Sequence, residues 1–144
     1  MKNRPIFSLL LVASTISICA AVGSGAPGVK IIVNENVTAS TLSSDEVKRI
    51  FLITKTSLSD GSHVEPVLAR GGATYHAFLK EYIGKTDSAL TIYYRSLVFT
   101  GKASMPKSLK SDAEVVAYVA RNKGAIGFVG ADAKTSGVKV LEVK

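Results

Sequence analysis

Apolar positions recur along this chain with two different periods, and the order of those periods predicts its elements. Four short runs rich in β-branched and other apolar residues predict strands: 29–33, 64–69, 125–129 and 138–143. Four segments with apolar residues three and four positions apart predict helices: 43–52, 75–83, 90–98 and the stretch between Ser111 and Gly124. Strands that alternate with helices are typical of an α/β fold.

Polar residues mark the ends of several predicted helices. Ser43 is followed three positions later by Glu46, and Ser111 by Glu114, and each pair predicts a capping box at a helix start. Gly84 is expected to end the second helix. The tyrosines fall at helical core spacing, so we expect buried rings with their hydroxyls at the rim of the core.

Two further local signals bear on the connections. Residues 100–109 contain Gly101, Pro106 and several lysines, which predicts an exposed loop. Pro66 lies near the start of the 64–69 strand, and a proline there indicates an edge strand or an irregular start.

The N-terminal residues have the features of an export signal. A basic start is followed by an apolar run and then by small residues, and cleavage is expected after Ala21 or Gly23. We therefore expect a signal peptide at 1–23, a linker at 24–28 and one domain at 29–144, located in the periplasm or secreted. The apolar run is short for a bilayer span, so the product should not be membrane-embedded. Cys19, the single cysteine, would leave with the signal.

The chain is basic, with 18 lysine and arginine residues against 11 acidic ones and a net charge of +7. Loss of Lys2 and Arg4 with the signal would leave about +5. This excess is compatible with an anionic ligand, an anionic envelope surface, or solubility alone. The lysines are scattered and the aromatics lie at core spacing, so no nucleic-acid partner is expected.

The sequence carries no pattern that indicates an enzyme, a metal site or a cofactor. His63 and His76 lack the spacing of metal ligands. Gly84-Lys85-Thr86 resembles the end of a nucleotide-binding loop, but the glycine required five positions earlier is Leu79. We therefore predict a binding protein that is not an enzyme, and no cofactor.

The most specific chemical pattern joins the 64–69 strand to the next helix: Arg70, Gly71, Gly72, Ala73 and Thr74. Two glycines allow a tight turn, and the first turn of a helix presents unpaired N–H groups and a partial positive charge. Arg70 adds a cation with a planar fork of donors. The pattern predicts an oxyanion site. The alternative is an ordinary turn whose arginine lies in solvent or pairs with a carboxylate.

Several segments, in order, resemble the phosphate-binding-protein family of ABC transporters, which are two-lobed periplasmic proteins. The matching segments are 41–52, 58–61, 70–78, 115–119 and 123–129. The resemblance implies one lobe of a periplasmic-binding-protein-like fold, with a three-layer arrangement of a sheet and helices on both faces. Aligned backward from Phe78, Thr74 takes the family's threonine position, Ala73 its glycine and Gly72 its serine. Arg70 matches the family's arginine only if two intervening residues are lost, and the serine donor is absent.

The resemblance covers about one lobe, so it implies an incomplete phosphate clamp. We expect weak binding of inorganic phosphate or a related oxyanion, and a homodimer or an envelope protein partner that could complete the cleft. The alternative is a protein-interaction or sensor-accessory domain that keeps the fold and has lost the ligand.

Overall fold

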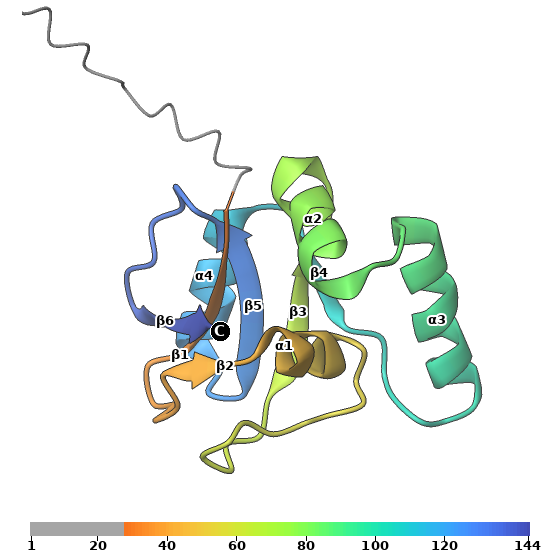
Figure 1. The fold of residues 1–144 in the computed structure, drawn as a ribbon, viewed down its shortest axis with the longest axis horizontal. Helices are drawn as coiled ribbons and strands as arrows, with labels where there is room; N and C mark the ends of the chain where they lie inside the picture. Colours follow the sequence, from red (N-terminus) through yellow and green to blue (C-terminus); the bar gives the residue numbers. More distant parts are fainter. Residues whose placement is uncertain (1–27) are drawn as a thin grey trace, which may run out of the picture.

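The computed structural model describes residues 28–144 (Figure 1). The segment predicted as a signal, Cys19 and all but the last residue of the predicted linker lie outside the described residues. The strands are β1 (Val29–Asn34), β2 (Thr41–Leu42), β3 (Glu65–Ala69), β4 (Lys107–Leu109), β5 (Ala125–Gly130) and β6 (Val138–Val143). The helices are α1 (Ser44–Phe51), α2 (Gly72–Phe78), the π-helical turn η1 (Leu79–Ile83), α3 (Asp87–Phe99) and α4 (Asp112–Arg121).

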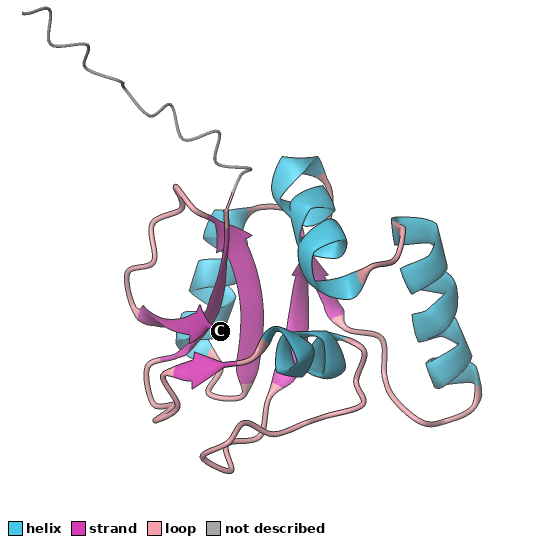
Figure 2. Ribbon diagram, in the orientation of Figure 1, coloured by secondary structure: helices cyan, strands magenta, loops and turns pink. Residues whose placement is uncertain are grey.

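The described strands form one mixed sheet in the order β2-β6-β1-β5-β3-β4. β3 runs parallel to β4 and β5, whereas β1 runs antiparallel to β5 and β6. Figure 2 shows α4 on one face of the sheet and α1 and α2 on the other. The structure therefore confirms an α/β fold with helices on both faces of a sheet.

An aromatic cluster joins the helices α1 and α2 to the sheet. The rings of Phe78 and Phe128 stack with centroids 3.9 Å apart, and Phe51 meets Phe78 edge-on at 4.7 Å. Tyr75 stacks on the same Phe128 ring at 6.3 Å. Each ring is almost completely buried, so this cluster fixes α2, and with it the turn at 70–74, onto the middle of the sheet.

The capping predictions are confirmed at α1 and half confirmed at α4. Ser43 Oγ accepts from Glu46 N–H and Ser43 N–H donates to Glu46 Oε2, which completes a capping box. At α4, Ser111 Oγ accepts from Glu114 N–H, but the Glu114 carboxylate accepts from the Lys110 N–H instead of from Ser111. Both arrangements pair backbone donors that the helix itself leaves free.

The helix predicted at 75–83 begins earlier and changes type. α2 starts at Gly72, and beyond Phe78 the helix widens into η1, where Gly84 N–H donates to Leu79 C=O five residues back. Gly84 ends the element with φ of 68°, which confirms the helix end expected at this glycine. The wider turn keeps Leu79, Tyr82 and Ile83 buried together.

The predicted loop at 107–109 was wrong, and of the two alternatives that Pro66 indicated for the 64–69 strand, the edge position was wrong. Residues 107–109 of the predicted exposed loop form β4, which pairs with β3, and the preceding Pro106 is buried. β3 is consequently an inner strand although it contains Pro66. Its pairing with β4 begins one residue later, at Val67, so the proline lies opposite no β4 residue. β2 was missed because two residues carry no periodic pattern.

The α3 helix is attached more loosely than its apolar spacing predicts. Leu90 and Tyr94 are buried, but Val98 is 46% exposed, and Ile92 and Phe99 are 67% and 93% exposed. In Figure 1, α3 stands to one side of the sheet and its other helices. The ring of Tyr94 is buried as expected, but its hydroxyl is buried too instead of lying at the rim of the core, and it donates to the backbone carbonyl at the end of α1.

Candidate oxyanion site

The predicted oxyanion segment lies at one edge of the sheet, where three parallel strands end. β3 ends just before α2 begins, β4 ends just before α4 begins, and β5 ends beside both (Figure 1). The crevice at the carboxyl ends of parallel strands is where α/β sheets usually hold ligands. The fold therefore brings two helix N-termini to an edge suited to an anion.

The turn into α2 depends on its two glycines. Gly71 and Gly72 have φ of 92° and 79°, a region that side chains other than glycine rarely adopt. No side chain caps α2. Gly71, Gly72 and Ala73 are exposed, and Thr74 is half-buried. The first N–H groups of α2 therefore lie at the surface without partners from the helix itself.

Thr74 faces a carboxylate that sequence reasoning did not single out. Gly130 N–H donates to Asp112 Oδ2 at 3.0 Å. A Cβ built on Gly130 would lie 3.1 Å from Thr74 Oγ1 and 3.2 Å from Asp112 Oδ2. The N-termini of α2 and α4 therefore approach each other across the end of β5, and a side chain at position 130 would crowd the hydroxyl and the carboxylate.

Arg70 follows β3, and its side chain turns toward α3. Its backbone N–H donates to Leu109 C=O at 3.0 Å, and its Nη1 lies 3.4 Å from Thr91 Oγ1. Its Nε is the one buried side-chain nitrogen or oxygen without a hydrogen-bond partner among residues 28–144. The ion pairs formed within this described region do not include Arg70. The guanidinium is therefore half-buried, unneutralised and short of one acceptor.

The Arg70 side chain is close enough to the hydroxyls of Tyr75 and Tyr94 for its charge to act on them. Burial raises the pKa of the Tyr75 hydroxyl, and its hydrogen bond to Asp87 at 2.7 Å raises that pKa further. Burial also raises the pKa of the Tyr94 hydroxyl. The positive charge of Arg70 acts on both groups and partly opposes these rises. Both hydroxyls therefore stay neutral near pH 7 and leave the Arg70 charge intact.

The five predicted residues are thus adjacent in the chain but differ in where they point. Gly71, Gly72 and Ala73 form the exposed tip, Thr74 faces Asp112, and the Arg70 side chain contacts α3. Asp112 and Gly130 were missed because they lie 38 and 56 positions beyond Thr74 and carry no local motif. The pairing of β3 with both β4 and β5 brings them together.

We also searched residues 28–144 for metal-ligand groups and for membrane-spanning helices. Within residues 28–144, no group of three histidine, cysteine, aspartate or glutamate residues is arranged to hold a metal ion. His63 pairs with Glu65 at 3.5 Å, and His76 is exposed on α2. None of the helices in this region is long and apolar enough to cross a bilayer.

Asp60 has a structural role although it lies in a segment that resembles the phosphate-binding family. Its carboxylate accepts hydrogen bonds from Ser62, Thr38 and the Ala39 N–H, and these bonds hold its pKa well below the usual range. It therefore joins the 35–40 segment to the turn before β3 and lies away from the α2 N-terminus.

No protein-family model and no curated protein sequence matches this chain. Solved structures do match. A protein from Clostridium perfringens described as a phosphate ABC transporter substrate-binding protein, with bound phosphate, aligns over 81% of this chain with a TM-score of 0.64 and 18% identity. An ABC-type phosphate transport receptor from Vibrio cholerae aligns over 81% with a TM-score of 0.62 and 18% identity. This chain has the fold of part of such a protein.

PstS from Borrelia burgdorferi gives a similar result, with a TM-score of 0.60 and 15% identity over 82% of this chain. The alignments cover 45%, 46% and 47% of these three proteins, respectively. This chain therefore spans less than half the length of each. The resemblance seen in the sequence is confirmed at the level of the fold.

Proposed function

We propose that this protein is an exported, single-lobe relative of the phosphate-binding proteins that binds phosphate or a similar oxyanion weakly. The observation that carries the proposal is the uncapped N-terminus of α2, at the carboxyl end of parallel strands and directly after an unneutralised arginine. The N–H groups of Gly72, Ala73 and Thr74 would donate to the anion, and Arg70 would supply the charge. The export signal predicted at 1–23 would direct the chain to the periplasm or out of the cell.

Asp112 favours phosphate over a fully ionised oxyanion. Its carboxylate accepts one hydrogen bond from Gly130 N–H and retains further acceptor capacity beside the Thr74 hydroxyl. Near pH 7 phosphate keeps at least one proton to donate, whereas sulfate has none and would meet only repulsion from the carboxylate. We therefore expect phosphate to bind more tightly than sulfate.

The affinity should be low because one lobe leaves the anion open to water. A charge-assisted hydrogen bond contributes about 1.5–3 kcal/mol when solvent is excluded and less when water competes. The exposed tip at 71–73 does not exclude water. We expect a dissociation constant of about 1 mM, which corresponds to about 4 kcal/mol.

Calorimetric titration of the purified protein with phosphate and with sulfate tests this proposal. Arg70→Ala should weaken phosphate binding by about tenfold or more because it removes the charge before α2. Arg95→Ala is the matched control, since Arg95 is exposed on α3 and its removal changes the net charge equally. Equal phosphate affinity in wild type and Arg70→Ala would show that phosphate binds elsewhere. Tighter binding of sulfate than of phosphate would show that Asp112 does not select an anion that carries a proton.

One observation supports a second candidate function, a protein-interaction domain that has lost the ligand. Ile92 and Phe99 project from α3 with 67% and 93% of their surface exposed, and glycine stands at position 72 where the family has a serine donor. Large exposed apolar side chains are typical of contact surfaces. The absence of calorimetric binding at about 10 mM phosphate, a concentration well above the expected dissociation constant, would favour this function.

A further inference from the structure

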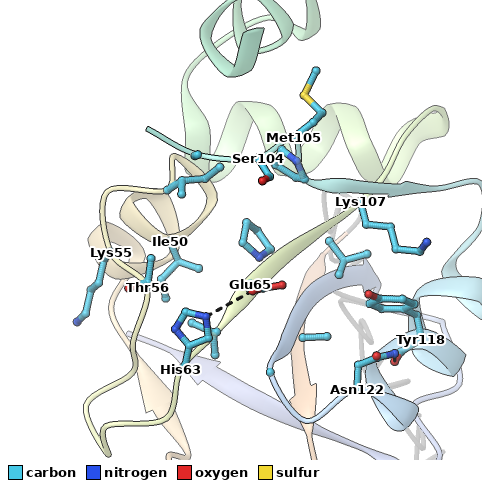
Figure 3. Close-up of a pocket in the computed structure, with 18 of the residues that line it drawn as sticks. Ile50, Lys55, Thr56, His63, Glu65, Ser104, Met105, Lys107, Tyr118 and Asn122 are labelled. Carbon is cyan, nitrogen blue, oxygen red and sulfur yellow. Dashed lines mark hydrogen bonds and ion pairs between the residues drawn. The ribbon is translucent and has the colours of Figure 1, made fainter. Parts of the chain in front are cut away.

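A cavity lies at the opposite edge of the sheet from the α2 N-terminus. It has a volume of about 740 Å³ and lies where β3 and β5 begin and where α4 ends. Figure 3 shows its walls: the segment after α1 with Lys55 and Thr56, the start of β4 with Lys107 and the preceding Ser104, and α4 with Tyr118. This volume falls within the range of small-molecule sites.

Positive charge is concentrated around this cavity. Residues 28–144 contain 16 lysine and arginine residues, since the chain has 18 and two of them are Lys2 and Arg4. Five of these line the cavity: Lys55, Lys102, Lys107, Arg121 and Lys123. Of the 11 acidic residues in the same region, only Glu65 lines it. The lining is therefore far more cationic than the described surface as a whole.

Three of these cations are held in position by their neighbours. Lys55 Nζ pairs with Glu46 at 2.5 Å, and Lys107 Nζ lies 5.1 Å from the centre of the Tyr118 ring. Arg121 Nε donates to a backbone carbonyl of α4 at 3.1 Å, which leaves its terminal nitrogens free. Cations that are already ordered lose less conformational entropy when they bind a ligand.

The net charge of the cavity lining remains positive after the neighbouring negative charges are subtracted. Glu65 and the partner carboxylate Glu46 reduce the five positive charges to three. The C-terminus of α4 adds about −0.5 of a charge and leaves about +2.5. The cations come from three separate segments of the chain, which form different walls of the cavity. An extended anion with several charges would reach all three segments.

We propose that this cavity binds a small polyanion with charges spaced along its length, of which condensed phosphates of a few units are the simplest class. The lysine and arginine side chains on the cavity wall would provide the recognition. The site shares no residue with the proposed oxyanion site at 70–74. Each proposal therefore stands or fails separately.

Titration of the purified protein with sodium tripolyphosphate, with orthophosphate held in excess, tests this inference. We expect saturable binding that weakens as salt rises, because the attraction between charges at a solvated site is screened. Lys107→Gln combined with Arg121→Gln should weaken binding by about tenfold. Lys80→Gln combined with Arg95→Gln removes the same charge from exposed positions outside the cavity and should leave the affinity unchanged.

Three outcomes would overturn the inference. They are no saturable binding of tripolyphosphate by wild type, equal losses in the two double variants, and loss of tripolyphosphate binding in Arg70→Ala. The last would assign the polyanion to the oxyanion site at the other edge. Retained tripolyphosphate binding in Arg70→Ala, together with lost orthophosphate binding, supports two separate sites.

Discussion

At the scale of single residues, two glycines of β5 lie in a strand that the sequence predicts, but the sequence does not predict why they are glycines. The apolar run at 125–129 predicts this strand. The run does not show why positions 127 and 130 are glycine, because the reason lies in residues distant along the chain. A Cβ on Gly127 would lie 2.7 Å from Val115 Cγ1, and one on Gly130 would meet Thr74 and Asp112. Gly127 allows α4 to pack closely against the sheet, and Gly130 leaves space between Thr74 and Asp112 at the candidate site.

Replacing Gly127 by alanine should destabilise the fold by about 1–3 kcal/mol, because the added methyl group overpacks the contact between β5 and α4. Chemical denaturation followed by circular dichroism measures this change. Gly124→Ala is the control, since its Cβ would lie 3.5 Å from the nearest carbonyl, an ordinary contact, and should change stability by less than about 0.5 kcal/mol. Equal stabilities of the two variants would contradict the packing described for α4.

At the scale of elements, local patterns predicted most helices and strands but not how firmly each is held. The cap at Ser43 and the glycine at position 84 are local signals, and both mark real helix ends. The pairing of 107–109 with β3 is not local, so the short polar sequence of this segment predicts a loop although it forms a strand. The apolar spacing of 90–98 predicted a well-packed helix, although Val98 is half exposed. Spacing defines a face of a helix but not how much surface is available to cover it.

The attachment of α3 depends on hydroxyl groups at its inner face. Tyr94 donates to Phe51 C=O, and Tyr93 donates to Leu52 C=O at 2.7 Å. Thr91, which contacts Arg70, lies on the same helix. The position of the Arg70 guanidinium is therefore linked to the docking of α3.

Tyr94→Phe should cost about 1–2 kcal/mol, because it leaves the buried Phe51 carbonyl without its donor. Hydrogen exchange should accelerate in 87–99 more than in α4, since the helix loses one of its anchors. Tyr118→Phe serves as the control, because the Tyr118 hydroxyl makes no hydrogen bond to the described residues. Unchanged protection of 87–99 in Tyr94→Phe would show that packing alone holds α3.

At the scale of the whole molecule, the chain has the fold of less than half of each phosphate-transport protein that it matches. The order of short segments was enough to predict this fold, because each segment carries caps, turns and apolar runs that agree with it. The composition of the candidate site was only partly predictable. Residues 70–74 form a contiguous pattern, whereas Asp112 and Gly130 join them only through the sheet. The proposed function therefore depends on whether residues 70–74, together with Asp112 and Gly130, bind an anion.

The most direct measurement is a titration of the isotopically labelled protein with phosphate, followed by the amide resonances in nuclear magnetic resonance spectra. The account predicts saturable shifts of the Gly72, Ala73 and Thr74 amides with a dissociation constant of about 1 mM, and loss of those shifts in Arg70→Ala. Amides at 72–74 that do not move at about 10 mM phosphate, or saturable shifts confined to other segments, would contradict it.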